Sequence, residues 1–227
     1  MAEYYLDALT AAKNYQSSIL RLITRNLPFE HARWKSPVLD FGAGHGDYAL
    51  HMGKRGYDVQ VLEPDPACQG ELKKRGLSTL SVMAPGAYRA IYSLNVFEHI
   101  EDDAEALQRC YRALLPGGRL FLYVPAHEEI WTALDDAVGH RRRYTQGGLR
   151  KLLTDGGFRV LGSGEHDYAG YWVSRWFARD RGKPVRVTTA RVLIFDRVVF
   201  PLGPLIRWIY PGSPGKNVWI VGEKIDV

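Results

Sequence analysis

Apolar residues follow two different spacings along the chain. In residues 2–26 they recur every three to four positions and stop before Pro28, which predicts one amphipathic helix. From Pro37 onward, short apolar runs alternate with helical patterns, which is typical of βα units around a mostly parallel sheet. Seven runs have the length of strands: Val38–Phe41, Val59–Leu62, Ser78–Met83, Ala90–Leu94, Arg119–Val124, Phe158–Gly162 and Asn217–Gly222. The pattern therefore predicts an α/β fold with a doubly wound sheet of seven strands.

Helical patterns separate these strands. They lie at Asp47–Arg55, Pro66–Arg75, Ala104–Leu115 and Gln146–Asp155. The stretch between the last two strands, roughly residues 168–215, is longer than a hairpin loop, so we expect further helices there. No linker rich in Pro, Ser or Gly divides the chain. Its 227 residues are therefore expected to form one domain.

Three glycines on alternate positions follow the first predicted strand, in the stretch Val38–Gly46. At the carboxyl edge of a parallel sheet, glycines permit a tight turn and let backbone N–H groups lie against a ligand. A dinucleotide site has its third glycine one residue later, and the Asp47 that follows here is unfavourable beside a phosphate. Asp40 and Asp47 suit a ligand with an ammonium group, such as the amino-acid end of S-adenosylmethionine. Gly42, Gly44 and Asp40 are therefore expected to seat that end.

The same stretch resembles the first motif of class I S-adenosylmethionine-dependent methyltransferases. Three further motifs follow in the order of that family: Val61–Asp65, Ser93–Asp103 and Leu114–Leu120. Residues 137–144 and 214–217 are also similar to a subgroup of the family that is often considered with polysaccharide, lipid or natural-product genes. The resemblance runs from about Tyr15 to Lys224, so it covers nearly the whole chain.

The resemblance implies a Rossmann-like sheet of seven mostly parallel strands with an antiparallel last strand, and S-adenosyl-L-methionine as the cofactor. It implies that Glu63 accepts the ribose hydroxyls, that Tyr15 covers the methionine part, that Met83 and Ala84 border the adenine, and that the segment after strand four lines the transfer site. The expected cofactor-binding residues are Tyr15, Asp40, Phe41, Gly42, Ala43, Gly44, Glu63, Pro64, Met83, Ala84, Asn95 and Val96.

Two positions depart from the family pattern. Family members often have an acid after strand three that binds the adenine amino group, but residues 81–86 contain none. The acid that usually begins strand four is missing as well, and Arg89 occupies the nearest position. These differences leave open a second interpretation, in which the methyltransferase fold serves a non-methylating enzyme or a binding or scaffold module.

The main expectation is methyl transfer from S-adenosylmethionine to a small-molecule acceptor, with O-, N- and C-methylation all open. The single domain should have four parts. These are an N-terminal helical cap (1–35), a cofactor-binding core (36–167), an insertion that forms a lid or acceptor site (168–215) and the final strand (216–227).

Three histidines are candidates for a catalytic base, because imidazole exchanges protons near neutral pH. His99 follows the fourth predicted strand, His127 follows the fifth, and His140 precedes three arginines. Capping, packing and turn-anchoring roles stay open for them. No metal-ligand cluster of convincing spacing is present in the sequence, so we expect no metal dependence.

The net charge of +5 comes from the C-terminal part of the chain. Residues 1–125 carry 14 basic and 14 acidic side chains, whereas residues 126–227 carry 16 and 11. The surplus belongs to Arg141–Arg143 and to the insertion, which is rich in aromatic residues and arginine. This composition fits an acceptor pocket for an anionic, lipid-linked or natural-product molecule, a homodimer interface, or peripheral contact with an anionic membrane. Nucleic acid is not expected, because no known nucleic-acid motif accompanies the tryptophans.

Compartment signals are few. Cys68 and Cys110 both lie in helical patterns, which indicates a reducing compartment rather than a disulfide framework. The first nine residues carry acids where a signal peptide needs basic residues, and charges and prolines interrupt the apolar run at 192–210. We therefore expect a cytoplasmic protein without a transmembrane helix.

Overall fold

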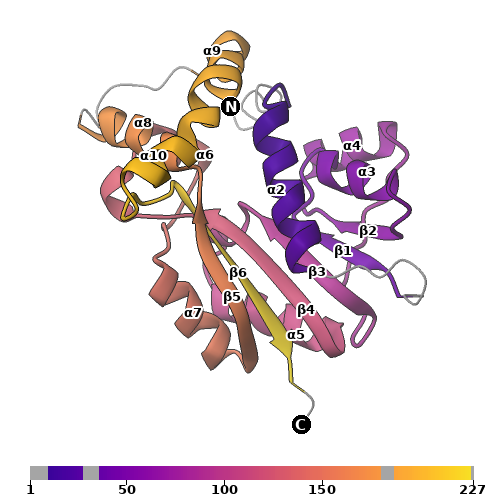
Figure 1. The fold of residues 1–227 in the computed structure, drawn as a ribbon. Coiled ribbons are helices and arrows are strands. Elements are labelled where there is room, and N and C mark those ends of the chain that lie inside the picture. Colours follow the sequence, from indigo (N-terminus) through magenta and orange to yellow (C-terminus); the bar gives the residue numbers. More distant parts are fainter. Residues whose placement is uncertain (1–9, 28–35, 180–186, 226–227) are drawn as a thin grey trace.

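The computed structural model describes residues 10–27, 36–179 and 187–225. In this part of the chain a mixed sheet of six strands has the order β2-β1-β3-β4-β6-β5 (Figure 1). The strands are β1 (Val38–Phe41), β2 (Val59–Leu62), β3 (Tyr88–Leu94), β4 (Leu114–Pro125), β5 (Phe158–His166) and β6 (Asn217–Lys224). The first four are parallel to their neighbours in this group, and β6 runs antiparallel to β4 and β5. The α/β class and the antiparallel last strand are thus confirmed.

The predicted strand Ser78–Met83 does not join the described sheet as a strand. Thr79 alone pairs, through one isolated parallel bridge to Val61. Val82 is 73% exposed, so little apolar burial supports a longer pairing beyond β2. The expectation of a seventh strand in this segment was therefore wrong. An apolar run in the sequence does not show whether another element of the fold covers its side chains.

Helices cover both faces of the sheet. Successive residues of β4 point to opposite sides, so Phe121 packs in one apolar cluster with α2 and α3, and Leu122 packs in another with α5 and α7. The helices of the core are α2 (Lys13–Asn26), α3 (Asp47–Gly53), α4 (Pro66–Lys74), η1 (Phe97–His99), α5 (Asp103–Ala113), η2 (Glu128–Ile130), α6 (Ala133–Val138) and α7 (Gln146–Asp155). The N-terminal part of the predicted first helix, residues 2–9, lies outside the described residues.

The insertion forms a helical layer beside α2, beyond the carboxyl ends of the strands (Figure 1). It contains α8 (Tyr168–Ala178), α9 (Thr189–Ile194), the π-helical turn η3 (Phe195–Val199), η4 (Phe200–Leu202) and α10 (Gly203–Ile209). The helices expected there are therefore present. Among the described residues, none of the helices combines the length and the hydropathy that a bilayer span requires.

One buried carboxylate ties this layer to α2. Asp196 of η3 is 2% exposed and accepts hydrogen bonds from the backbone N–H groups of Asn14, at 3.0 Å, and Tyr15, at 2.8 Å. The first turn of a helix has N–H groups without helical partners, and the N-cap residue Ala12 provides no side-chain acceptor. Asp196 therefore caps α2 from the other end of the sequence.

Candidate functional site

The glycine turn joins β1 to α3 at the carboxyl edge of the sheet. Gly42, Gly44 and Gly46 all have positive φ, at +79°, +55° and +79°. A Cβ on Gly42 would lie 2.3 Å from a methyl carbon of Val96, so only glycine fits there without movement. A Cβ on Gly44 would meet no atom within 4 Å. The turn is thus closely packed at its first glycine and open at its second.

Glu63 lies beside this turn, directly after β2. One carboxylate oxygen accepts a hydrogen bond from Gly44 N at 2.7 Å, and the other accepts one from Asp65 N at 2.9 Å. The Glu63 side chain is buried, and β1 and β2 pair in parallel, so their carboxyl ends are adjacent. Each carboxylate oxygen has a second lone pair, so Glu63 can still accept hydroxyl groups of a ligand.

Asp40 lies at the end of β1 and is 2% exposed. The hydroxyl of Tyr92 donates to its carboxylate at 2.9 Å. Burial raises the pKa of Asp40 to about 7, although the hydrogen bond from Tyr92 works in the opposite direction. Asp47 has a different environment from the one expected, because it forms an ion pair with Arg75 at 2.9 Å. Arg75 therefore already pairs with Asp47, the acid that was expected to suit the ammonium group of a ligand.

The other expected cofactor residues follow the ends of β1, β2 and β3. Phe41 is buried and packs on Phe97, with ring centroids 5.9 Å apart. Asn95 is exposed and has a positive φ of +53°, which turns the chain directly after β3. Met83 is buried, Ala84 and Pro64 are exposed, and Ala43 and Val96 are half-buried. Consistent with the sequence, residues 81–86 contribute no acid.

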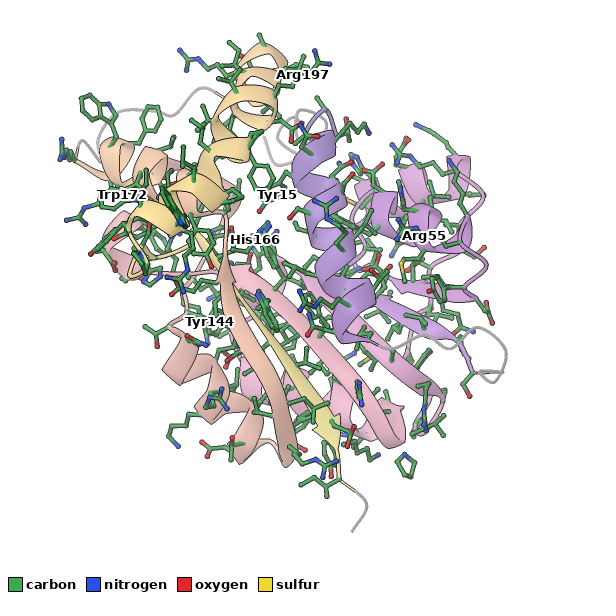
Figure 2. The ribbon with its side chains drawn as sticks, in the orientation of Figure 1. Tyr15, Arg55, Tyr144, His166, Trp172 and Arg197 are labelled. Carbon is green, nitrogen blue, oxygen red and sulfur yellow. The ribbon has the colours of Figure 1, made fainter. Side chains whose placement is uncertain are left out.

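A chain of polar contacts crosses the same sheet edge. Tyr15 OH lies 2.8 Å from Tyr123 OH, and Tyr123 OH lies 2.8 Å from Nδ1 of His166. Nε2 of His166 in turn lies 2.8 Å from the Ser18 hydroxyl. Figure 2 shows Tyr15 and His166 close together between α2 and the end of β5. Burial lowers the pKa of His166 to about 4, so this imidazole is neutral at pH 7.

Asn217 connects this chain of contacts to the cofactor segment. The register places it opposite both Pro125 of β4 and His166 of β5. Its amide nitrogen donates to Asn95 Oδ1 at 3.3 Å, and its Oδ1 accepts from Tyr15 OH at 3.4 Å. Sequence reasoning did not assign roles to Tyr123, His166 or Asn217. A correct end for β5, four residues later than predicted, would have placed His166 at the functional edge.

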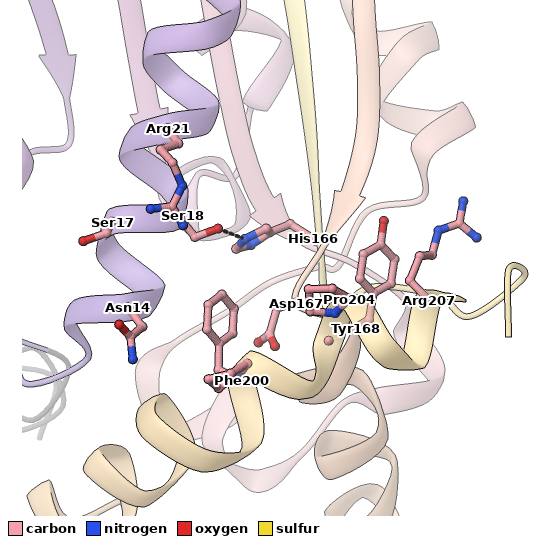
Figure 3. Close-up of a pocket in the computed structure, with 12 residues that line it drawn as sticks. Asn14, Ser17, Ser18, Arg21, His166, Asp167, Tyr168, Phe200, Pro204 and Arg207 are labelled. Atoms are coloured by element: carbon pink, nitrogen blue, oxygen red, sulfur yellow. Dashed lines mark hydrogen bonds between the residues drawn. The ribbon is translucent and has the colours of Figure 1, made fainter. Parts of the chain in front are cut away.

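A cavity of about 610 Å³ opens beyond Ser18 and His166, between α2 and the insertion (Figure 3). Two cations, Arg21 and Arg207, line it from opposite walls. Asp167 is the acid in the lining, and burial raises its pKa. The cavity therefore combines apolar walls with two arginines and short polar groups.

His127 lies two residues after the end of β4 and has a φ of +65°, which is uncommon for a residue with a Cβ. Its Nε2 lies 3.0 Å from a carboxylate oxygen of Glu165. The second oxygen of Glu165 accepts a hydrogen bond from Gly215 N at 2.7 Å. The ring also packs edge-on against Tyr171 of α8. Nδ1 of the same ring lies 3.6 Å from a carboxylate oxygen of Glu129, so carboxylates face both nitrogens of His127 and hold the ring between them.

The other two candidate histidines lie together elsewhere on this edge. His99 ends η1, His140 follows α6, and their ring centroids are 4.8 Å apart. Glu98 is fully buried beside them, and burial raises its pKa to about 8. His140 Nδ1 lies 2.7 Å from Asp135. The fold thus separates His127 from a second group made of Glu98, His99 and His140.

The arginines that follow His140 are all paired. Arg141 lies 3.6 Å from Glu101, Arg142 lies 3.0 Å from Asp103, and Arg143 lies 2.8 Å from the buried Asp135. This run was expected to supply part of the positive surplus for an anionic acceptor. The charge of this run is instead neutralised by these neighbouring carboxylates. The arginines that line the cavity are Arg21 and Arg207.

Comparison with known proteins now adds to this geometry. A family model described as "Methyltransferase domain" matches residues 11–162, which contain the glycine turn, Glu63 and the segment after β3. The chain belongs to this methyltransferase family. The resemblance to class I S-adenosylmethionine-dependent methyltransferases is thereby confirmed. The insertion and β6 lie outside the matched residues.

Methyltransferases recur among similar sequences and structures. A ubiquinone biosynthesis O-methyltransferase of Xanthomonas oryzae pv. oryzae is 26% identical over 98 residues, which cover 37% of this chain and 41% of that relative. The match therefore spans less than half of the curated relative. Geranyl diphosphate C-methyltransferase from Streptomyces coelicolor A3(2), solved with S-adenosyl-L-homocysteine, has a TM-score of 0.64, 12% identity, and coverage of 92% of this chain and 77% of its own.

A further similar structure is that of a protein named as a cyclase rather than as a methyltransferase. The [4+2]-cyclase SpnF has a TM-score of 0.61 and 18% identity, and the match covers 92% of this chain and 81% of that one. At these identities both structures show a shared fold. The methyltransferase fold is therefore not confined to proteins named as methyltransferases.

Proposed function

We propose that this chain transfers the methyl group of S-adenosyl-L-methionine to a small-molecule acceptor. The observation that carries the proposal is the hydrogen bond from Gly44 N to Glu63 at the adjacent ends of β1 and β2. It places a carboxylate beside an open glycine turn, which suits a ribose with two hydroxyls. Transfer from a sulfonium is an in-line displacement, so the main task of the protein is to align methyl group and acceptor.

The cofactor runs along the ends of three strands in this proposal. Gly42, Gly44 and Asp40 hold its methionine end, Glu63 accepts its ribose hydroxyls, and Asn95 lies at the transfer site. The remaining members of the set surround it with apolar surface and backbone: Tyr15, Phe41, Ala43, Pro64, Met83, Ala84 and Val96. The four parts of the domain keep the boundaries given above, with the insertion as the acceptor side.

Calorimetric titration with S-adenosylhomocysteine tests the cofactor site. We expect saturable binding to the unmodified chain and a loss of at least about tenfold in affinity for Gly44→Ala, because the new methyl group enters the space left for the ligand. Gly117→Ala is the matched control, since Gly117 has a φ of +65° and equally open surroundings. Both changes strain the backbone alike. Equal affinities for the two variants, or no binding to the folded chain, contradict the proposal.

The acceptor occupies the cavity between α2 and the insertion in this proposal. Arg21 and Arg207 favour an acceptor with a carboxylate, phosphate or phenolate group, because a guanidinium pairs well with such oxygens. His127 serves as the general base, with Glu165 holding its ring. Because His127 does not line the cavity, this role requires an acceptor that extends beyond the cavity to the ring. A general base is needed when the acceptor group loses a proton during methyl transfer.

A non-methylating activity on the same fold is the second candidate. The shared fold of the [4+2]-cyclase SpnF and the missing acid in residues 81–86 favour it. Transfer of labelled methyl groups from S-adenosylmethionine separates the two candidates. Label in a small-molecule extract of the reaction supports methylation, whereas tight cofactor binding without transfer to any fraction favours the second candidate.

The outer surface of the insertion supports a further part of the proposal, peripheral contact with an anionic membrane. Trp208 is 79% exposed, and Trp176 and Ile209 are each 68% exposed. Asp196 is the acid among the described residues of the insertion, and it is buried. Among the described residues of the insertion, Arg175, Arg179, Arg197 and Arg207 are exposed together with these apolar side chains, as on proteins that bind anionic lipid surfaces. The alternative is that a second copy of this chain covers this surface and forms a homodimer.

A further inference from the structure

We propose that Glu98, His99 and His140 bind a divalent transition-metal ion of the Zn²⁺ or Fe²⁺ type. One ligand atom from each of the three residues lies within 4.8 Å of the others. Two of the residues belong to η1, directly after β3, and the third follows α6. The proposal concerns metal binding alone and does not depend on the proposed methyl transfer.

Both imidazole rings are oriented as in metal sites. His140 Nδ1 lies 2.7 Å from Asp135 Oδ1, and His99 Nδ1 lies 3.2 Å from the carbonyl oxygen of Gly139. A nitrogen that faces a carboxylate or carbonyl oxygen carries the proton, which leaves Nε2 with a free lone pair. A metal-binding histidine commonly donates its other N–H to such an oxygen. In both rings, Nε2 is thus the atom available to a metal.

The outer partner of His140 is itself held firmly. Asp135 is 1% exposed and accepts hydrogen bonds from the backbone N–H of Thr132, at 2.8 Å, and from two nitrogens of Arg143, at 2.9 and 3.0 Å. Its carboxylate therefore cannot turn away without breaking several bonds. The direction of the His140 ring is set before any ligand arrives, which is the preorganisation that a metal site needs.

Glu98 supplies the observation that points to a ligand. Its side chain is fully buried, yet neither carboxylate oxygen has a hydrogen-bond partner among the described residues. Buried polar groups in folded proteins are nearly always satisfied, and binding of an ion is one of the accepted reasons for an exception. His140 Nε2 lies 3.7 Å from Glu98 Oε1. A metal ion bound by both atoms satisfies this carboxylate.

The separation between Glu98 and His140 already fits a metal. Bonds of about 2.1 Å in a tetrahedral site place neighbouring ligand atoms about 3.4 Å apart. His99 is exposed, and a rotation of its ring that keeps the contact between Nδ1 and the carbonyl oxygen of Gly139 can close the remaining distance. Two imidazoles and one carboxylate suit Zn²⁺, Fe²⁺ or Mn²⁺ better than Mg²⁺ or Ca²⁺, which prefer oxygen ligands. Three protein ligands leave one or more positions open.

This inference departs from the expectation drawn from sequence. Glu98 and His99 are adjacent, but His140 lies 41 residues beyond His99, a spacing without a metal signature. The hydrogen bond from Arg141 N to Glu98 O, at 2.9 Å, brings the two segments together. Only the folded chain therefore forms the cluster.

The experiment uses the full chain without an affinity tag, stripped of metal by a chelator and then dialysed. Zn²⁺ binding is measured by calorimetry, and Co²⁺ is used as a spectroscopic substitute. We expect one Zn²⁺ per chain, and visible Co²⁺ bands of a four- or five-coordinate site. His99→Ala and His140→Ala should each weaken Zn²⁺ binding by at least about tenfold, and Glu98→Gln should alter the Co²⁺ bands.

His51→Ala is the matched control, because His51 is an exposed histidine on α3, outside the cluster. It should leave Zn²⁺ affinity and the Co²⁺ spectrum unchanged. Thermal unfolding of every metal-free variant, measured separately, shows that the fold is intact. The proposal is overturned if the folded chain binds no Zn²⁺ saturably, or if His51→Ala loses as much affinity as His99→Ala.

Discussion

Buried charged groups dominate the site at the scale of single residues. Asp40 lies under the glycine turn with one hydrogen-bond donor, Tyr92, and its carboxylate is poorly solvated. Glu63 is also buried, but its carboxylate accepts hydrogen bonds from two backbone N–H groups. The two acids therefore differ in environment, although Asp40 lies within β1 and Glu63 directly follows the adjacent strand β2. A buried acid with few donors weakens the fold in its ionised form, and a cationic ligand can offset that cost.

The first prediction concerns Asp40→Asn. The pKa of Asp40 is 3.8 in an unfolded chain and about 7 in the folded protein, so the folded state binds the proton more tightly. Stability should therefore fall as pH rises from about 4 to 7, by at most about 4 kcal/mol. Asparagine removes this dependence and still accepts the hydrogen bond from Tyr92.

Thermal unfolding of both proteins without cofactor checks this prediction. The Tm of Asp40→Asn relative to the unmodified chain should be higher at pH 8 than at pH 5. The same variant should lose affinity for S-adenosylhomocysteine, because the ammonium group loses its carboxylate. A constant difference in Tm across this pH range would show that Asp40 does not titrate there.

The second prediction at this scale concerns His127→Asn. Asparagine keeps a polar group that tolerates positive φ, but it cannot serve as a base. We expect kcat for labelled methyl transfer to fall by about 10² to 10⁴, with the Kd for S-adenosylhomocysteine unchanged. His51→Ala is again the control for loss of a histidine. A fall in cofactor affinity that matches the fall in kcat would argue for a positioning role instead.

At the scale of elements, α2 depends on the insertion for its N-terminal cap. Asp196 supplies acceptors to Asn14 N and Tyr15 N across 181 or more residues of sequence. The negative carboxylate also lies at the positive end of the helix dipole. Because α2 carries Tyr15, Ser18 and Arg21, the cap connects the insertion to both the proposed cofactor site and the cavity.

The third prediction is that Asp196→Ala destabilises the chain by about 1–2 kcal/mol and frees the start of α2. Hydrogen exchange should accelerate in residues 13–18. Thr145→Ala is the matched control, since Thr145 caps α7 through Gly148 N on the other face of the sheet. That variant should lose comparable stability while exchange in α2 stays slow. Slow exchange in α2 of both variants would contradict the capping role.

At the scale of the whole molecule, charge and apolar exposure are concentrated on the insertion. Figure 2 shows Trp172 and Arg197 on this side of the protein, with Arg55 on the other side of α2. Among the described residues of the insertion, ten large apolar side chains are at least 40% exposed. In the proposed membrane contact, these apolar side chains meet acyl chains and the exposed arginines meet anionic headgroups.

The fourth prediction follows for lipid vesicles with one-third phosphatidylglycerol. The chain should sediment with them, and added salt should weaken the binding because the headgroup attraction is screened. Trp208→Ser should reduce binding, whereas Val82→Ser should not, since Val82 is similarly exposed but lies outside the insertion. Equal loss of binding in both variants would contradict the role of the insertion, and self-association without vesicle binding would favour the homodimer instead.

Local features were predictable from the sequence. The strand boundaries at 38–41 and 59–62, the helix 146–155 and the positive φ of the glycine turn all follow from short-range sterics and periodicity. Those features, with the order of motifs, were enough to identify the family. Ser78–Met83 shows the limit, because pairing at a sheet edge depends on what covers it.

What only the tertiary structure decided is which distant side chains meet. The contacts of Tyr15 with Tyr123 and of Tyr123 with His166 join residues from three elements, and Asp196 reaches α2 from the far end of the chain. Carboxylates from other segments neutralise Arg141–Arg143, and His140 comes beside Glu98. Sequence by itself determined the glycine turn and the layered fold, because these depend on neighbouring residues and their spacing. The partners of each charged group depend on how the elements pack, which no local pattern records.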